Sequence, residues 1–181
     1  IAERLKGGET RIADSFAEVT VLFADIVGFT NLSSTTPPRD LVHMLNDLFT
    51  RFDQSAHRNG VEKIKTIGDA YMAVAGLTNP HPDNSRRIVK LALEMLDHVR
   101  DFSEENGVPL SVRIGVNSGP AVAGVIGSSK FIYDLWGDTV NTASRMESHG
   151  LPGHIQVSEA TYQLLKADFV LEDRGIIEIK G

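Results

Sequence analysis

The stretch of residues 61–76, VEKIKTIGDAYMAVAG, places the strongest constraint on the fold of this chain. It is rich in β-branched, aromatic and small apolar residues, and Gly68 and Asp69 interrupt it with a turn signal. The pattern therefore predicts a β-hairpin with strands at residues 61–67 and 70–75.

Lys65 and Asp69 lie on opposite sides of the predicted turn. Taken alone, the two side chains are expected to form a salt bridge. The alternative is that Asp69 binds a metal ion and Lys65 binds another polar group. A hard divalent cation needs more than one carboxylate, so this alternative requires a second acid in a similar setting, and Asp25 is the candidate.

Asp25 interrupts the apolar strand that is predicted for residues 18–27. An unpaired carboxylate buried there costs on the order of several kcal/mol, so it needs a cation, a backbone donor or a metal. A turn-capping role is equally open, because Gly28 follows closely. Phe29 and Thr30 then lead into a polar stretch, and backbone amides around such a glycine turn are able to approach phosphate oxygens.

Composition sets the class of protein. With 181 residues, 41% of them hydrophobic and 23% charged, the chain fits one globular domain. The net charge of -6, without a basic run, predicts no nucleic-acid partner. The absence of cysteine excludes a disulfide framework, a thiolate zinc site and a thiol nucleophile, and it fits a reducing compartment.

The sequence contains no apolar run near the ~20 residues of a membrane span. It starts at Ile1 rather than Met, so we expect a cytoplasmic domain from a longer protein, with an upstream membrane anchor or sensor module. We expect residues 1–18 to be a linker or the end of an upstream connecting helix.

The other elements follow from hydrophobic periodicity. The predicted helices are residues 39–59, 85–105, one that starts at residues 137–139, and 158–166. The predicted strands are residues 108–116, 121–127, 131–136, 155–157 and 169–179, with a turn at residues 117–120. The βαββαβ order of the first elements predicts an α+β fold with a ferredoxin-like core and helices on one face of a mainly antiparallel sheet.

Two charged residues lie inside these later strands. Arg113 stands between Val112 and Ile114, where an arginine usually pairs with a carboxylate. The alternative is binding of a phosphate, whose geometry suits the guanidinium fork. Asp134 repeats the pattern of Asp25, because it is an acid in an apolar strand just before a glycine.

The helix that follows carries an amide and a guanidinium on one face. Asp138 is its predicted N-cap, and Asn141 and Arg145 lie one turn apart. Presented together, these two side chains suit stabilisation of an oxyanion. The alternative for Arg145 is an ordinary ion pair with Glu147 or Glu172.

Five segments, taken in order, resemble one family. They are FADIVGFT at residues 23–30, VEKIKTIGDAYM at 61–72, VRIGVNSGP at 112–120, YDLWGDTVNTASRMES at 133–148 and RGIIEIKG at 174–181. Together they closely resemble the catalytic domain of class III nucleotidyl cyclases. The resemblance runs from about Val19 to Gly181, so residues 19–181 are expected to form the catalytic domain.

The resemblance implies a metal and phosphate site. Asp25 and Asp69 match the aspartates that hold a pair of Mg²⁺ or Mn²⁺ ions in each site, with the carbonyl of Ile26 as a further ligand. The positions that match phosphate-binding residues are Gly28, Phe29, Thr30, Arg113 and Lys180. The family usually continues past Lys180 with a closing strand, so a C-terminally truncated domain is expected.

The resemblance also implies a substrate and an assembly. Lys65 and Asp134 match the pair that reads adenine, where guanylyl cyclases typically carry Glu and Cys, so an adenylyl cyclase that converts ATP to 3′,5′-cyclic AMP is expected. Asn141 and Arg145 match residues that orient the ribose and stabilise the transition state. In the family, metal-binding and base-reading residues of one site come from different chains, so a homodimer with two equivalent sites is expected.

Three alternatives differ from this expectation. A guanylyl cyclase is disfavoured by Lys65 and Asp134. A catalytically silent nucleotide-binding or dimerisation module would lack at least one metal-binding or transition-state residue, and none is missing from the sequence. A diguanylate cyclase or polymerase-like palm would carry a GGDEF-type acidic turn, which the sequence lacks.

Overall fold

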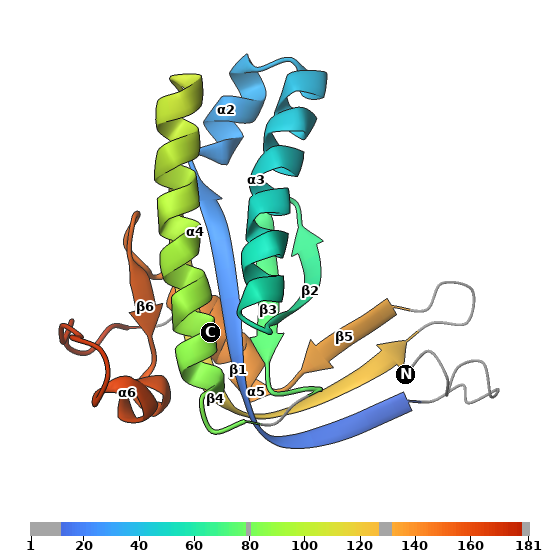
Figure 1. Ribbon diagram of the computed structural model, residues 1–181, viewed down its shortest axis with the longest axis vertical. Helices are drawn as coiled ribbons and strands as arrows, with labels where there is room; N and C mark the ends of the chain where they lie inside the picture. Colours follow the sequence, from blue (N-terminus) through green and yellow to red (C-terminus); the bar gives the residue numbers. More distant parts are fainter. Residues whose placement is uncertain (1–11, 79–80, 127–131, 179–181) are drawn as a thin grey trace.

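The computed structural model describes residues 12–78, 81–126 and 132–178 (Figure 1). Residues 1–11 of the expected linker and the expected phosphate ligand Lys180 lie outside these ranges. Among the helices of the described ranges, none is long and apolar enough to cross a membrane.

The strands form one six-stranded sheet. They are β1 (Ile12–Val27), β2 (Glu62–Ile67), β3 (Ala70–Ala75), β4 (Ser111–Ile126), β5 (Ile132–Trp136) and β6 (Ile155–Val157). Their order is β2-β3-β1-β4-β5 with antiparallel neighbours, and β6 joins β4 in parallel. The first four strands and the two long helices between them confirm the predicted βαββαβ core.

Two long helices cover one face of this sheet. The long helices are α3 (Pro38–Arg58) and α4 (Asn84–Asn106). The shorter helices of the described ranges are α2 (Phe29–Thr35), α5 (Asp138–Ser148) and α6 (Glu159–Leu165). Helices α3 and α4 lie side by side (Figure 1) and bury Leu22, Ala24 and Ile26 of β1. The hairpin and both long helices lie where the sequence predicts them.

Helix α5 packs on the opposite face of the sheet, which corrects the expectation of helices on one face only. Val21 and Phe23 of β1 point to that face and join Ala143 of α5 in a second apolar cluster. The packing requires Gly115, because a Cβ there would lie 1.9 Å from the backbone N of Glu147. The run from Val19 to Ala24, in which Thr20 is the one polar residue and every side chain is buried, is typical of a strand buried on both faces.

Strand β4 is continuous through residues 117–120, so the predicted turn there is wrong. The proline of this stretch lies opposite the register shift between Phe16 and Val19, where its missing N–H group disrupts no regular ladder. Residues 12–17, which were expected to be linker or helix, belong to β1 and pair with the second half of β4.

Two other segments differ from the prediction. Residues 29–35 form helix α2, where only a polar stretch was expected. The strand predicted at residues 169–179 is wrong for its described part, which has no regular secondary structure. Val170 and Ile176 are fully exposed there, because no described strand pairs with this segment, and an apolar pattern without a hydrogen-bonded neighbour makes no sheet.

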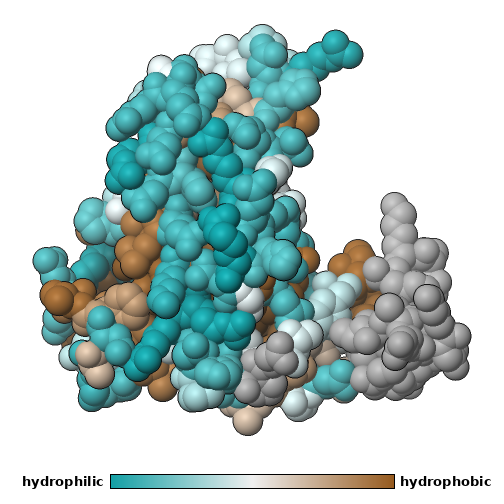
Figure 2. All heavy atoms as spheres, viewed as in Figure 1, coloured by the Kyte–Doolittle hydropathy of each residue, from teal (hydrophilic) through white to brown (hydrophobic). Residues whose placement is uncertain are grey.

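Strand β5 and the adjoining ends of β1 and β4 form a ribbon that projects from the body, here called the arm (residues 12–16, 121–126 and 132–136). It extends to the right in Figure 1. Ile126 and Ile132 of the arm are 62% and 57% exposed, and apolar atoms are visible on this side in Figure 2. The arm therefore presents apolar side chains to its surroundings.

Candidate active site

Asp25 and Asp69 come together where β1 ends beside the β2–β3 turn. Asp25 is the cross-strand partner of Ala70, the residue after Asp69, and Gly68 forms the turn with a positive φ of 62°. Burial raises the pKa of Asp69, and the negative charge of Asp25 raises it further. The two carboxylates therefore repel each other unless a proton or a cation lies between them.

This pair fits a hard divalent cation. Carboxylate oxygens are the ligands that Mg²⁺ and Mn²⁺ prefer, and a cation would relieve the repulsion between Asp25 and Asp69. The side chain of Ile26 is buried on the other face of the sheet, so only its main chain is available as a ligand. The described residues contain no group of three or more metal-ligating side chains, so backbone and substrate oxygens would complete the coordination.

Arg113 lies directly beside this acidic pair. It is the cross-strand partner of Asp25, and its Nη2 donates to Asp25 Oδ2 at 3.0 Å while its Nε donates to Glu147 Oε1 at 3.2 Å. The carboxylate pairing that the sequence analysis considered for Arg113 is therefore formed. The guanidinium therefore lies next to the candidate metal ligands.

Glu147 is a member of this group that the sequence analysis did not predict. Its side chain is 13% exposed, and burial raises its pKa, as does the charge of Asp25. Thr139 and Ala143 are the buried residues of α5, and Glu147 continues that i+4 row. An acid on the sheet-facing side of a helix needs a partner. The four-residue spacing of Thr139, Ala143 and Glu147 was therefore the sequence signal that could have identified Glu147.

Lys65 forms an ion pair with Asp134 rather than with Asp69. The two side chains come from β2 and β5, which lie at opposite ends of the strand order. The lysine is 34% exposed and the aspartate 16%, and Asp134 Oδ1 also accepts from the backbone N of Leu135 at 2.9 Å. The expected base-reading residues are thus neighbours in one chain.

Asn141 and Arg145 project from α5 without a side-chain hydrogen bond or ion pair in the described ranges. The alternative pairing of Arg145 with Glu147 is not formed, because Glu147 binds Arg113. The N-cap of this helix is Gly137 rather than Asp138, which lies in the first turn. Gly137 has a φ of 134°, which glycine adopts without a steric penalty, and this conformation allows the sharp change of direction after β5.

Buried side chains anchor the start of α5. Asn117 Nδ2 donates to the backbone O of Thr139 at 3.0 Å, and Thr139 Oγ1 donates to the backbone O of Pro120 at 2.6 Å. Ser158 Oγ donates to Asn117 Oδ1 at 2.5 Å. These bonds fix the helix that carries Asn141 relative to the sheet.

Gly28, Phe29 and Thr30 form the entry to α2, next to the end of β1. Gly28 has a φ of 82°, and its carbonyl accepts from the backbone N of Leu32 at 3.1 Å. Phe29 packs against the core, while Gly28 and Thr30 are exposed. The backbone amides of this turn have no acceptor within a helix.

The predicted site residues thus fall into two contact groups within one chain. Asp25, Asp69 and Arg113 form the first group. Lys65 and Asp134 form the second. No hydrogen bond or ion pair between described residues joins the two groups, and neither includes the side chains of α5 that were expected to act on the nucleotide.

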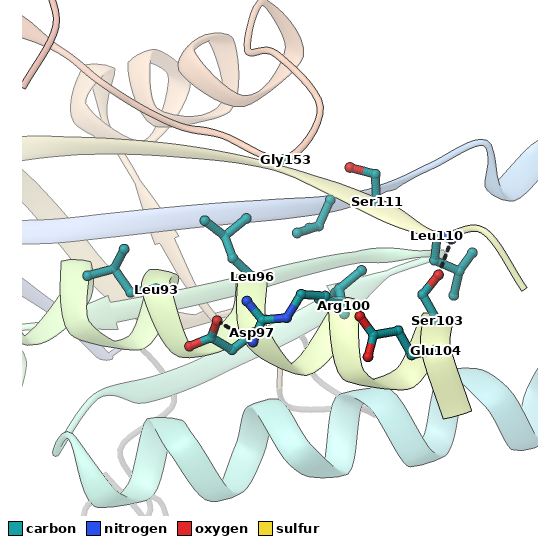
Figure 3. Close-up of a pocket in the computed structure, with 11 residues that line it drawn as sticks. Leu93, Leu96, Asp97, Arg100, Ser103, Glu104, Leu110, Ser111 and Gly153 are labelled. Carbon is teal, nitrogen blue, oxygen red and sulfur yellow. Dashed lines mark hydrogen bonds and ion pairs between the residues drawn. The ribbon is translucent and has the colours of Figure 1, made fainter. Parts of the chain in front are cut away.

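A pocket of the described chain lies elsewhere. Figure 3 shows this pocket, of about 520 Å³, between α4 and the start of β4. Leu93, Leu96 and Leu110 line it, and Arg100 lies at its edge in an ion pair with Asp97 at 2.9 Å. None of the predicted site residues lines this pocket.

The chain matches the family described as the adenylate and guanylate cyclase catalytic domain over residues 12–181. It belongs to this family, the class III nucleotidyl cyclases. An adenylate cyclase of Mycobacterium tuberculosis (strain ATCC 25618 / H37Rv) is 50% identical over 100% of this chain and 41% of its own length. The receptor-type guanylate cyclase gcy-28 of Caenorhabditis elegans is 47% identical over 100% of this chain and 14% of its own length.

A solved structure agrees with this assignment. The guanylate cyclase domain of RhGC from Catenaria anguillulae in complex with GTP aligns with a TM-score of 0.89 and 44% identity, over 93% of this chain and 92% of that chain. The chain spans less than half the length of the curated relatives described above. The similarity defines the class of enzyme domain, and the relatives include both adenylate and guanylate cyclases.

Proposed function

We propose that this domain is an adenylyl cyclase that converts ATP to 3′,5′-cyclic AMP and pyrophosphate. The observation that carries the proposal is the pairing of Lys65 with Asp134. In the family pattern, guanylyl cyclases typically carry Glu and Cys at these positions. The match of this lysine and aspartate to the adenine-reading pair supports ATP as the substrate.

The two side chains have the chemistry that adenine requires. The ammonium of Lys65 donates to N1 of adenine, and the carboxylate of Asp134 accepts from the exocyclic amine. Guanine presents the opposite pattern of donors and acceptors at these two atoms. It would leave both partly buried groups unpaired, which is a strong basis for rejection.

The acidic pair supplies the proposed metal site. Asp25 and Asp69, with the carbonyl of Ile26, would hold a pair of Mg²⁺ or Mn²⁺ ions, which lower the pKa of the ribose 3′-hydroxyl and offset phosphate charge when bound. In the reaction, the ribose 3′-oxygen bonds to the α-phosphorus as the bond from that phosphorus to pyrophosphate breaks. The proton of the hydroxyl group is released.

The other proposed site residues bind and orient the nucleotide. The proposed phosphate ligands are the backbone amides of Gly28, Phe29 and Thr30 and the side chains of Arg113 and Lys180. Asn141 orients the ribose, and Arg145 meets the negative charge that develops at the α-phosphate. Preorganised groups of this kind contribute on the order of several kcal/mol to the transition state.

We further propose that the domain acts as a homodimer with two equivalent sites. The separation of the site residues into two contact groups supports shared sites, as do the exposed side chains of Ile126 and Ile132 on the arm, which a second copy would cover. We also propose a cytoplasmic domain of a longer, membrane-tethered or sensor-controlled protein, in line with the receptor-type relative.

Formation of cyclic nucleotides from ATP and, separately, from GTP tests this function, with Mn²⁺ and a range of protein concentrations. We expect cyclic AMP from ATP, with a specific activity that rises as dimers form and that is lost when a chelator removes the metal. Cyclic GMP as the main product would favour a guanylyl cyclase. No product from either nucleotide at high protein concentration would favour a silent module.

A further inference from the structure

One arginine links the acidic pair to helix α5. Arg113 uses its Nε for Glu147 and its Nη2 for Asp25, so the two carboxylates hold different nitrogens of the same guanidinium. Their side chains are 13% and 24% exposed. Both contacts are therefore largely shielded from water, where charge-assisted hydrogen bonds are strong.

We infer that Glu147 is a positioning residue for the cyclase reaction. It holds the guanidinium of Arg113 by Nε, so that Nη2 faces the nucleotide phosphates once Asp25 binds metal ions. This inference rests on the proposed function, and it assigns a role to a side chain that touches neither nucleotide nor metal.

The geometry explains why a second carboxylate is needed. When Asp25 binds cations, Nη2 of Arg113 loses its acceptor, and the guanidinium comes to lie next to positive charges that repel it. A phosphate oxygen is a suitable replacement acceptor for Nη2. Because Glu147 binds a different nitrogen, it keeps the guanidinium in place while this exchange occurs.

The backbone around Glu147 is fixed independently of its side chain. Helix α5 lies directly on β4 at Gly115. Arg113 is two residues before Gly115 on β4. The Glu147 carboxylate therefore reaches Arg113 from a rigid backbone position. A substitution of the Glu147 side chain therefore removes one contact of Arg113 without displacing the helix.

The Glu147→Ala variant tests the inference. We expect a higher KM for ATP and a weaker affinity for 3′-deoxyATP, which lacks the attacking hydroxyl and reports binding without turnover. Both should change on the order of tenfold, as expected for one charge-assisted hydrogen bond, with a smaller change in kcat. Glu147→Gln, which keeps an acceptor oxygen of the same reach, should restore part of the affinity.

A double-mutant cycle separates positioning from a merely structural role. If Glu147 acts through Arg113, Glu147→Ala should have no further effect on affinity for 3′-deoxyATP in an Arg113→Ala background. Losses that multiply instead would overturn the inference. Glu105→Ala, which removes the carboxylate partner of Arg51 at 2.7 Å, is the matched control and should leave the affinity unchanged.

The same measurements keep the inference distinct from the proposed function. A wild-type domain that forms no cyclic nucleotide contradicts the function. A wild-type domain that is active, with unchanged 3′-deoxyATP affinity in Glu147→Ala, contradicts only the positioning role. If Glu147→Ala does not fold, the near-isosteric Glu147→Gln decides, because the inference predicts weaker binding there too.

Discussion

At the scale of single residues, Arg113 is the side chain for which we propose two successive sets of contacts. Its contacts with Asp25 and Glu147 satisfy it in the free domain. The proposed contact with phosphates uses the same guanidinium after Asp25 binds metal. A strand arginine therefore need not be either a structural ion pair or a phosphate ligand, because one side chain can be both in turn.

Exchange of the proposed base-reading pair, Lys65 and Asp134, should change the nucleotide that is used. In the double variant Lys65→Glu with Asp134→Cys, glutamate accepts from the donors of guanine and cysteine no longer repels its O6. We expect the ratio of kcat/KM for ATP to that for GTP to fall on the order of a hundredfold or more. Lys63→Ala, which removes a neighbouring lysine paired with Asp53, is the control, and unchanged ATP selectivity of the double variant would contradict the assignment.

His98 should make stability depend on pH. Its Nε2 lies 2.8 Å from Ser55 Oγ, and burial lowers its pKa from the ordinary value of 6.5, although Glu94 opposes the shift. The unfolded chain thus binds the proton more readily than the folded chain does. The free energy of unfolding therefore has its full value above pH 6.5. It decreases as the pH falls from 6.5 to the folded-state pKa of His98.

Urea unfolding at about pH 7.5 and about pH 5.5 measures this effect. The loss of stability at the lower pH should be smaller in His98→Gln, which cannot titrate and keeps an amide near Ser55. An equal pH dependence of the two proteins would show that His98 is not responsible.

The sequence provided the candidate site residues, which remain a prediction, but not their contacts. Asp25 and Asp69 were linked only by their similar settings and by the resemblance to the cyclases, since their contact depends on the register between β1 and β3. For Lys65, the nearest acid in sequence was the wrong partner. Local spacing favours Asp69, whereas the structure brings Asp134 to Lys65 from β5.

At the scale of elements, the contact of α5 with β4 is the most sensitive to size. A Cβ at residue 115 would lie 1.9 Å from the backbone N of Glu147 and 2.6 Å from the backbone O of Ala143. Backbone atoms cannot move aside without shifting α5, so Gly115→Ala should destabilise the domain by about 3 kcal/mol. Its cyclase activity should also fall, because α5 carries Asn141.

Thermal unfolding of Gly115→Ala against Gly107→Ala measures this contact. Gly107 has a φ of 63° and no atom within 4 Å of an added Cβ, so its alanine variant should cost only about 1–2 kcal/mol of backbone strain. Equal stability of the two variants would show that the close approach of α5 to β4 does not restrict the size of residue 115.

The elements that the sequence predicted well are those with local signals. The periodicity of α3 and α4 and the glycine turn of the hairpin needed no long-range information. The turn signal of residues 117–120 failed because the side chain of Asn117 binds Thr139 of α5 rather than its own backbone. The fate of such a residue depends on what packs beside it, which local patterns do not contain.

At the scale of the whole molecule, the two edges of the sheet approach each other. Strands β1 and β4 curve toward the arm (Figure 1), and β2 contacts β5 although they lie at opposite ends of the strand order. This contact includes the ion pair of Lys65 with Asp134. No hydrogen bond or ion pair between described residues joins this pair to Asp25 or Asp69. The proposed function therefore predicts that a complete site needs residues from two copies, and this is its central claim.

Mixing two inactive variants tests this claim most directly. Asp69→Ala removes a proposed metal ligand, and Arg145→Ala removes the proposed transition-state residue, so each variant alone should form almost no cyclic AMP from ATP with Mn²⁺. In a mixed dimer, one of the two sites keeps every residue, so the mixture should recover substantial activity. Activity of the mixture no greater than the sum of its parts would contradict shared sites, provided that the variants form mixed dimers.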